Sequence, residues 1–363
     1  MDGGGARKRP TITDVARRAR VSGATVSYVL NDRPGVGEAS RRRVLKAAEA
    51  LGYRRNRLAR GLRDGRTHVF GLLLANIANP FYPEIAAGVI AVAAESGYQV
   101  FVSHTGEDQA QQRREVEALS DHGCDGLIFT SVTDADRELL RKLLEAGPPF
   151  VQAVRRVRGI RADYVGIDNR AAGRDVILHL VALGHRDIAL ISGPLASSAS
   201  RGRYEGMREV LAESGLALPA DRFTESALTR EAGYRAATSL LQGRKRPTAI
   251  ACGNDMIALG AIDAGIEAGL QMPAELAVTG FDDMSFASSR MVNLTTISQP
   301  LREIGVTAVE LLRSRLRDPS QAPRDVILPH RLIVRGSSSA PAPAVSKPSP
   351  GAAVTRPPRR RRG

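Results

Sequence analysis

The stretch from Thr11 to Arg63 decides how the chain is organised: TITDVARRARVSGATVSYVLNDRPGVGEASRRRVLKAAEALGYRRNRLARGLR. Thr11 and Asp14 have the spacing of a capping box, which predicts that a helix begins here. Ser22 is a good N-cap for a second helix that ends near Leu30. Two short helices with a three- to four-residue turn between them predict a helix-turn-helix. The alternative is a generic helix pair inside a larger core.

A third helix is predicted to follow, with Val44 and Ala47 on its apolar face and Gly52 as its C-cap. Residues 56–63 place leucine and alanine on one side and arginines on the other. This segment is too short to be stable as an isolated helix. We therefore expect a linker helix that forms only when a partner holds it.

The charge of the chain is concentrated at its ends. The net charge is +14, and residues 1–66 carry 17 Lys and Arg against 6 Asp and Glu. Residues 337–363 carry six basic residues and no acidic one, so the body between them is slightly acidic. Basic ends on a near-neutral body are typical of proteins that bind nucleic acid. The alternative is that the basic residues only form solvated arms.

Several other functional classes lack support in the sequence. Cys124 and Cys252 stand in apolar, strand-like contexts without metal-ligand spacing, which predicts buried and inert thiols. The six histidines form no metal set, and no cofactor is implied. No apolar run reaches the 18 or so residues of a membrane helix, and the N-terminus lacks a signal peptide. We expect a cytoplasmic protein, associated with the nucleoid when it is bound to DNA.

From His68 onward, short apolar runs alternate with amphipathic helical segments. Runs such as VFGLLLA, GLIFTSV, DIALIS and TAIAC are typical of parallel strands that are covered on both faces. The pattern restarts near residue 163, which predicts two doubly wound halves with ligand at the carboxyl ends of their strands. A last helix is predicted over Leu301–Arg317. Residues 1–9 and 337–363 are predicted to be disordered.

Ordered motifs along the chain resemble the lactose/galactose repressor (LacI/GalR) family. They include ITDVARRARVSGATVSYVLN, VFGLLLANIANPFY, RDIALISGP, AIACGNDMIALGA and LAVTGFDD, and they extend from about Thr11 to Ser338. The resemblance implies an α/β fold: an N-terminal helix-turn-helix DNA-binding head and a periplasmic-binding-protein-like core of two doubly wound parallel-sheet subdomains. The implied boundaries are a head at 10–55, a hinge at 56–66 and a core at 67–336. Within the core, subdomain 1 would span 67–166 and 299–327, and subdomain 2 would span 167–298 and 328–336.

For DNA, the resemblance places polar side chains on phosphates, which fix register without reading sequence: Ser22, Thr25, Ser27 and Asn31. The positions that face bases would be Gly23, Ala24 and Tyr28. In the hinge, Leu62 matches an apolar wedge that enters the minor groove. Further implied contacts are Thr11, Asn56, Ala59 and Arg63. The alternatives are a Tyr28 ring packed against the head and a Leu62 that only packs within a linker.

For a small-molecule effector, the resemblance implies seven cleft residues: Asn79, Phe81, Tyr82, Arg203, Asn254, Asp255 and Asp282. Arginine, Asp and Asn can bind polyol hydroxyls, and an aromatic ring can cover an apolar sugar face. The alternatives are a structural salt bridge between Arg203 and Asp282, and Asp255 as a helix cap. Val154 and Leu228 depart from the family pattern, and the chain has no Trp. A sugar is the leading ligand class, and a nucleobase or another metabolite remains open.

The resemblance implies a ligand-responsive transcription regulator, usually a repressor, that binds a palindromic operator as a homodimer. Two other classes fit the core alone: a solute-binding module, and an enzyme that metabolises sugars or nucleotides. The missing signal peptide and the attached head disfavour the first. The lack of a phosphate-cradling glycine loop and of a Ser/His/Asp order disfavours the second. Whether an effector would release DNA or promote its binding stays open.

Overall fold

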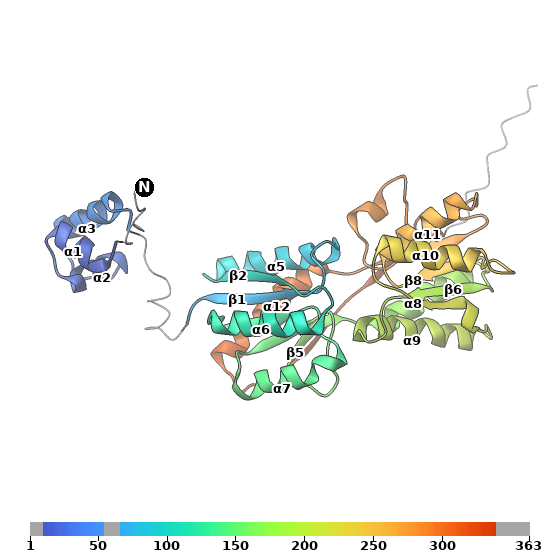
Figure 1. The fold of residues 1–363 in the computed structure, drawn as a ribbon, viewed down its shortest axis with the longest axis horizontal. Helices are drawn as coiled ribbons and strands as arrows, with labels where there is room; N and C mark the ends of the chain where they lie inside the picture. The colour runs from blue at the N-terminus through green and yellow to red at the C-terminus, as the bar shows by residue number, and fades with distance from the viewer. Residues whose placement is uncertain (1–9, 54–65, 339–363) are drawn as a thin grey trace, which may run out of the picture. The chain divides into compact units, whose positions relative to one another are not determined.

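The computed structural model describes residues 10–53 and 66–338 (Figure 1). The chain divides into two compact units, residues 1–67 and residues 68–363. We describe the first unit as the head and the second as the core, each by itself. Among the described residues, no helix has the length and apolarity needed to cross a membrane.

The head is built from three short helices: α1 (Ile12–Ala19), α2 (Gly23–Leu30) and α3 (Glu38–Ala50). The capping box at Thr11 and Asp14 is present, and the Ser22 hydroxyl accepts from the Thr25 amide to cap α2. Both helix starts therefore agree with the sequence prediction. Arg20 adopts a left-handed conformation that ends α1 and turns the chain into α2.

One small apolar cluster holds the three helices together. It is made of short side chains from each helix: Val15, Ala16, Ala19, Val26, Val29, Val44, Ala47 and Ala48. Small residues let the helix axes come close, so the outer faces of α2 and α3 stay free for other contacts. This packing is the helix-turn-helix arrangement that the sequence predicts.

The first lobe of the core contains a six-stranded parallel sheet in the order β11-β5-β4-β3-β1-β2. Its strands are β1 (Val69–Leu74), β2 (Gln99–His104), β3 (Gly126–Phe129), β4 (Phe150–Ala153), β5 (Asp163–Ile167) and β11 (Asp325–Leu328). The central strands are buried along almost their whole length, whereas β2 forms an exposed edge. The helices of this lobe are α5 (Phe81–Glu95), α6 (Gln109–Asp121), α7 (Arg137–Ala146) and α12 (Leu301–Arg317), with the short η1 (Asp134–Asp136) before α7.

The second lobe contains a four-stranded parallel sheet in the order β7-β6-β8-β9. Its strands are β6 (Ile188–Ser192), β7 (Phe223–Glu225), β8 (Ala249–Cys252) and β9 (Ala277–Thr279). Its helices are α8 (Asn169–Ala182), α9 (Ser198–Glu213), α10 (Arg230–Leu241) and α11 (Asp255–Glu267), with η2 (Ala220–Arg222) and η3 (Ser285–Ser288) in the loops. Figure 1 shows the two lobes joined by extended segments.

A two-stranded antiparallel ribbon accompanies the second lobe, formed by β10 (Thr296–Ser298) and β12 (Arg331–Ile333). The chain enters the second lobe after β5, returns through β10 to α12, and crosses again between β11 and β12. Two doubly wound parallel-sheet lobes confirm the fold class expected from the alternating pattern.

The structure differs from the sequence prediction in three places. Strands β7 and β10 were not predicted, because each has only three residues and lacks a long apolar run. The predicted tail begins two residues too early, since Ser337 and Ser338 are buried in the core. Ser337 accepts from the Thr295 amide and donates to the Val278 carbonyl, which ties this segment to β9 and β10.

Candidate DNA-reading surface and effector cleft

Helix α2 presents its base-facing candidates to solvent. Gly23 and Ala24 are exposed, and a Cβ added at Gly23 would meet no atom within 4 Å. The Tyr28 side chain is 44% exposed, and the Arg33 guanidinium lies 5.9 Å from the centre of its ring. The ring is thus not packed into the head core. It is available to a partner of α2.

Several of the polar side chains proposed for phosphates already bind within the head. Ser22 and Thr25 hydroxyls lie 2.9 Å apart, and the Asn31 amide donates to the Ser27 carbonyl at 2.7 Å and to its hydroxyl at 3.2 Å. Thr11 donates to the Asp14 carboxylate from both its amide and its hydroxyl. These bonds fix the side chains before any partner arrives, which lowers the entropy lost on binding.

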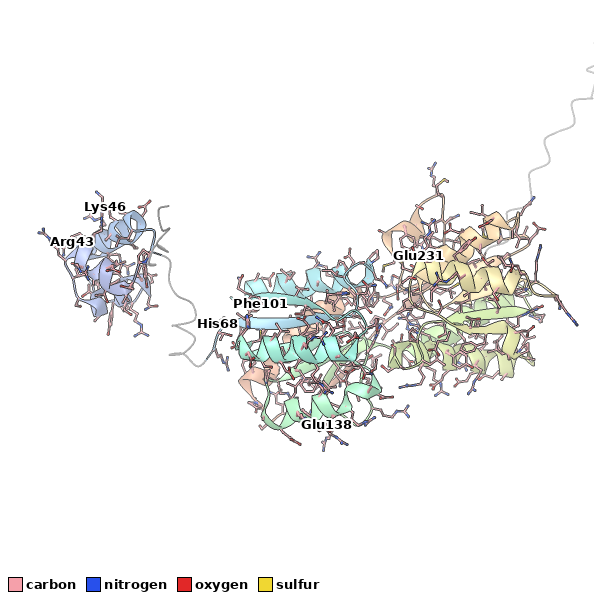
Figure 2. All side chains as sticks on the ribbon, viewed as in Figure 1. Arg43, Lys46, His68, Phe101, Glu138 and Glu231 are labelled. Carbon is pink, nitrogen blue, oxygen red and sulfur yellow. The ribbon has the colours of Figure 1, made fainter. Side chains whose placement is uncertain are left out.

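Basic side chains are exposed on the two helices that pack with α2. Arg17 and Arg18 are exposed on α1, and Arg43 and Lys46 project from α3 (Figure 2). Exposed basic side chains of this kind attract the phosphate backbone of a nucleic acid independently of its sequence. The hinge candidates lie outside the described residues: Asn56, Ala59, Leu62 and Arg63.

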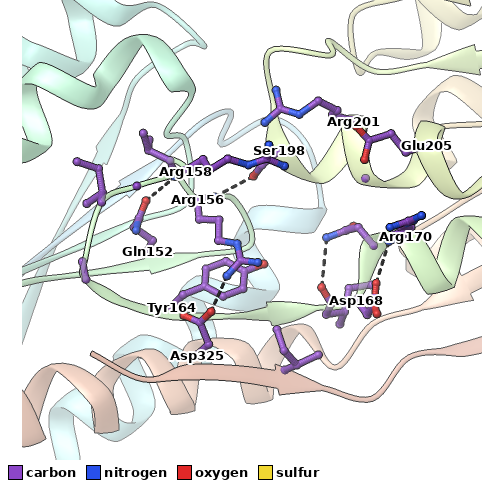
Figure 3. Close-up of a pocket in the computed structure, with 18 residues that line it drawn as sticks. Gln152, Arg156, Arg158, Tyr164, Asp168, Arg170, Ser198, Arg201, Glu205 and Asp325 are labelled. Atoms are coloured by element: carbon purple, nitrogen blue, oxygen red, sulfur yellow. Dashed lines mark hydrogen bonds and ion pairs between the residues drawn. The ribbon is translucent and has the colours of Figure 1, made fainter. Parts of the chain in front are cut away.

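Two cavities in the described part of the core lie between its lobes, and the larger of these two does not gather the predicted residues. Its volume is about 600 Å³, and it opens between the β4–β5 loop, the start of α8 and the first turns of α9 (Figure 3). Three of the four arginines that line it are paired with acids: Arg156 with Asp325, Arg170 with Glu209 and Arg201 with Asp134. None of the seven predicted cleft residues lines this cavity, so we place the candidate effector site in the smaller one.

The smaller cavity has a volume of only about 20 Å³, room for roughly one water molecule. Six of the seven predicted cleft residues line it: Asn79, Phe81, Tyr82, Arg203, Asn254 and Asp282. The first three come from the loop and first turn of α5 in the first lobe, and the others come from the second lobe. We call this small cavity, with the residues that line it, the cleft. In this state the cleft is closed.

Arg203 occupies the centre of the cleft and is 6% exposed. Its Nε donates to Asn169 at 2.9 Å, and its Nη1 donates to the Gly253 carbonyl at 2.7 Å. Its guanidinium carbon lies 3.6 Å from the centre of the Phe281 ring. The planar group is thus held on three sides, as a recognition arginine needs to be.

Helices α8 and α9 approach closely enough to aim Arg203. A Cβ at Gly173 would lie 2.2 Å from the Arg203 carbonyl oxygen, and a Cβ at Gly206 would lie 2.0 Å from the Arg170 carbonyl oxygen. Glycine at both positions lets the two backbones touch. Any larger residue would push α9, and Arg203 with it, away from α8.

Asp282 is the acidic partner of Arg203 in the cleft, with the carboxylate 3.4 Å from the guanidinium. Gln299 donates to the same carboxylate at 2.7 Å. Burial raises the pKa of Asp282 to about 6, although Arg203 and Gln299 oppose the shift. The salt bridge that the sequence left as an alternative therefore exists, and it lies inside the cleft.

Two cleft residues have a strained backbone. Val154 has a φ of 68° and Asp282 a φ of 117°, conformations that favour glycine. A β-branched residue at positive φ costs on the order of 1–3 kcal/mol and persists where the surroundings impose it. Such strain concentrates at binding sites, and here it sits on either side of the closed cleft.

Arg155 is a cleft residue that the sequence reasoning missed. It is 3% exposed, donates to Glu107 at 2.6 and 2.7 Å, and also donates to the Tyr82 hydroxyl. Burial opposes its charge, but Tyr82 and Glu107 together raise its pKa. Burial also raises the pKa of Tyr82 to about 12, so the hydroxyl stays neutral. Its position directly after a buried strand, β4, is the signal that could have identified it.

Asp255 is the exception among the seven predicted residues, because it does not line the cleft. It is fully buried and accepts from the Met284 amide at 2.7 Å and the Thr296 hydroxyl at 2.6 Å. The alternative that Asp255 caps α11 is also wrong, since the cap is Asn254, which accepts from the Ile257 amide. Asp255 supports the loop that carries Asp282.

Four more residues complete the lining: Ser197, Ala199 and Ser200 at the start of α9, and Leu228. The three residues at the start of α9 were not predicted, although they come just before Arg203 in the sequence. Among the described residues, no group of three or more His, Cys, Asp and Glu could hold a metal ion.

A helix-turn-helix head and a core of two doubly wound lobes around a polar cleft define a class of DNA-binding regulators. Comparison with known proteins agrees with this class. Residues 11–56 match the family model of bacterial regulatory proteins, lacI family, and residues 67–336 match that of periplasmic binding proteins and the sugar binding domain of the LacI family.

Three individual proteins illustrate the similarity. Catabolite control protein A of Priestia megaterium is 34% identical over 329 residues, 90% of this chain and 99% of that protein. The ribose operon repressor of Escherichia coli (strain K12) is 34% identical over 331 residues, 90% and 99% of the two proteins. The lac repressor dimer bound to operator and the anti-inducer ONPF superimposes with a TM-score of 0.83 at 29% identity, covering 92% of this chain and 100% of that one.

The chain belongs to the LacI/GalR family of bacterial transcription regulators. It is therefore a DNA-binding transcriptional regulator, and the relatives named above are regulators rather than enzymes.

Proposed function

We propose that this regulator is a repressor that binds a palindromic operator as a homodimer and is controlled by a small sugar-like effector in the cleft. The observation that carries the proposal is the cleft itself. Buried polar groups from both lobes converge there around a space of only about 20 Å³. A ligand that enters must change how the lobes meet, which is a means of control.

DNA reading would depend on α2 and on the hinge. Tyr28 is the exposed side chain of α2 that can contact a base edge, and Ala24 can contact a thymine methyl group. Ser22, Thr25, Ser27 and Asn31 would hold phosphates from their fixed positions. The hinge, residues 56–66, would fold on DNA and insert Leu62 into the minor groove. With few base-reading side chains on α2, DNA shape would supply much of the specificity.

A homodimer would bring two heads to the two halves of the operator. The outer strand β2 supports this, because Phe101 and Val102 are 44% and 41% exposed on a sheet edge (Figure 2). Exposed apolar edge strands are aggregation-prone unless another chain covers them. The similar lac repressor structure is a dimer bound to operator. Because its DNA target lies there, the protein would work in the cytoplasm, on the nucleoid.

Sequence selection tests the DNA half of the proposal. Full-length protein is incubated with random-sequence duplex DNA at two salt concentrations, and the bound fraction is sequenced. We expect an inverted repeat to be enriched, with affinity falling steeply as salt rises. A Tyr28→Ala variant should enrich a more degenerate repeat of the same spacing. Absence of any enriched sequence at either salt concentration would reject the proposal.

A further inference from the structure

The start of α9 carries a buried hydroxyl that has no partner. Ser197 is 2% exposed and lines the cleft, and within the described part of the chain its Oγ makes no hydrogen bond. Leaving a buried hydroxyl unpaired costs free energy, so such groups find a partner in water, an ion or a ligand. The Ser197 hydroxyl is thus a donor that a ligand in the cleft would use.

The same residue is the N-cap of a 16-residue helix, and its side chain makes no cap bond. The N–H groups of a first helical turn lack intrahelical acceptors, and the helix end carries partial positive charge. Ala199 and Ser200 in that first turn also line the cleft. The helix therefore directs an anion-binding end into the cavity.

The two cleft arginines differ in how well they are neutralised. Arg155 has a bidentate partner in Glu107 at 2.6 and 2.7 Å. The Arg203 guanidinium lies 3.4 Å from the Asp282 carboxylate, which also accepts a hydrogen bond from Gln299. Burial lowers the pKa of Arg203, which shows that its surroundings compensate its charge incompletely.

We propose that the effector is an acidic polyol, a sugar-like molecule bearing a carboxylate or a phosphate, whose anionic group binds between Ser197 and Arg203 at the N-terminus of α9. The inference rests on the proposed function, since it assigns the charge of the ligand in the same cleft. The anion supplies acceptors for the Ser197 hydroxyl, the first amides of α9 and the remaining guanidinium N–H groups. The anion binds Arg203 beside Asp282, whose carboxylate accepts a hydrogen bond from Gln299. The hydroxyls of the polyol contact Asp282 and Asn79.

Matched pairs of ligands test the charge assignment on the full-length protein. Gluconate is compared with sorbitol, glucose 6-phosphate with glucose, and inorganic phosphate with chloride, all at one ionic strength. Thermal unfolding and calorimetric titration give Tm and Kd. We expect at least one acidic probe to raise Tm and to bind at least about tenfold more tightly than the compound with which it is paired. The pair with the larger difference identifies carboxylate or phosphate.

Two serine variants locate the anion. Ser197→Ala should weaken binding of the acidic probe about tenfold or more, because a hydrogen bond to a charged group is lost. Ser214→Ala is the matched control, since Ser214 is exposed at the C-terminal end of the same helix. An acidic probe that binds Ser197→Ala as tightly as wild type would overturn the proposal, as would equal losses in both variants.

Failure of this proposal is distinguishable from failure of the proposed function. If neutral sugars bind as tightly as their acidic twins, the anionic effector is rejected while a sugar-responsive regulator stands. If no acidic probe, inorganic phosphate included, raises Tm, the anion site is likewise rejected. Selection of a palindrome by the same protein preparation would still support the regulator.

Discussion

Asp255 offers a sharp test of the electrostatics around the cleft. Burial, and next the charge of Asp282, raise its pKa from an ordinary 3.8 to about 8. The folded protein then keeps a proton on Asp255 at pH 6, where the unfolded chain has already lost it. Because the folded state binds more protons, raising the pH destabilises it. Between pH 6 and 8 this one group removes about 2 kcal/mol of the free energy of unfolding.

Replacing Asp255 with Asn keeps the shape and removes the titration. The side-chain oxygen of an Asn at position 255 can accept from the Met284 amide, and its NH₂ group can donate to the Thr296 hydroxyl. Met284 and Thr296 are the present partners of Asp255. The free energy of unfolding is measured in urea at pH 6 and pH 8. Between these two pH values it should fall by about 2 kcal/mol less in Asp255→Asn than in wild type. Asp121→Asn, at an exposed acid in the last turn of α6, is the control and should follow wild type. Parallel pH profiles for wild type and Asp255→Asn would refute the assignment of a neutral, buried Asp255.

Four further substitutions probe the head, the hinge, the helix contact and the dimer. Tyr28→Ala should cost about 1–3 kcal/mol of discrimination between operator and a single-base mismatch, as read by titration of both duplexes; equal affinities for wild type and variant would remove Tyr28 from base reading. Leu62→Ala should weaken operator binding more than non-specific binding at fixed salt, and an equal loss on both would contradict the wedge role. Gly173→Val should destabilise the core by about 1–3 kcal/mol in urea and weaken effector binding, because its Cβ would lie 2.2 Å from the Arg203 carbonyl oxygen. Phe101→Asp should convert dimers to monomers in sedimentation, and an unchanged dimer would show that β2 is not the interface.

Much of the fold could be predicted from the sequence, because the residues that mark the ends of helices act locally. Capping residues such as Thr11 and Ser22 mark helix starts by their own hydrogen bonds, and the structure begins α1 and α2 beside them. The last long helix occupies Leu301–Arg317, as predicted from its amphipathic pattern. Strands β7 and β10 were not predicted, because neither short strand lies within a long apolar run.

The cleft residues could be predicted only in part from the sequence, because their interactions join residues that are far apart in the chain. Arg155 is paired with Glu107, which is 48 residues away in the chain. The unpaired hydroxyl of Ser197 is a property of the folded environment and leaves no trace in the sequence. Asn254 lines the cleft as predicted and also caps α11, whereas the adjacent Asp255 takes neither role.

An effector in the cleft can control DNA binding only if the cleft and the DNA-reading head are energetically coupled. The most direct measurement is the affinity of full-length protein for its selected palindrome, with and without a saturating ligand found in the probe screen. We expect the ligand to change operator affinity by about 5–150-fold, equivalent to a coupling of 1–3 kcal/mol, and operator to change ligand affinity by the same factor. Ser197→Ala should shift the ligand concentration needed without changing affinity for free operator. Ligand binding in the cleft that leaves operator affinity unchanged would contradict the account.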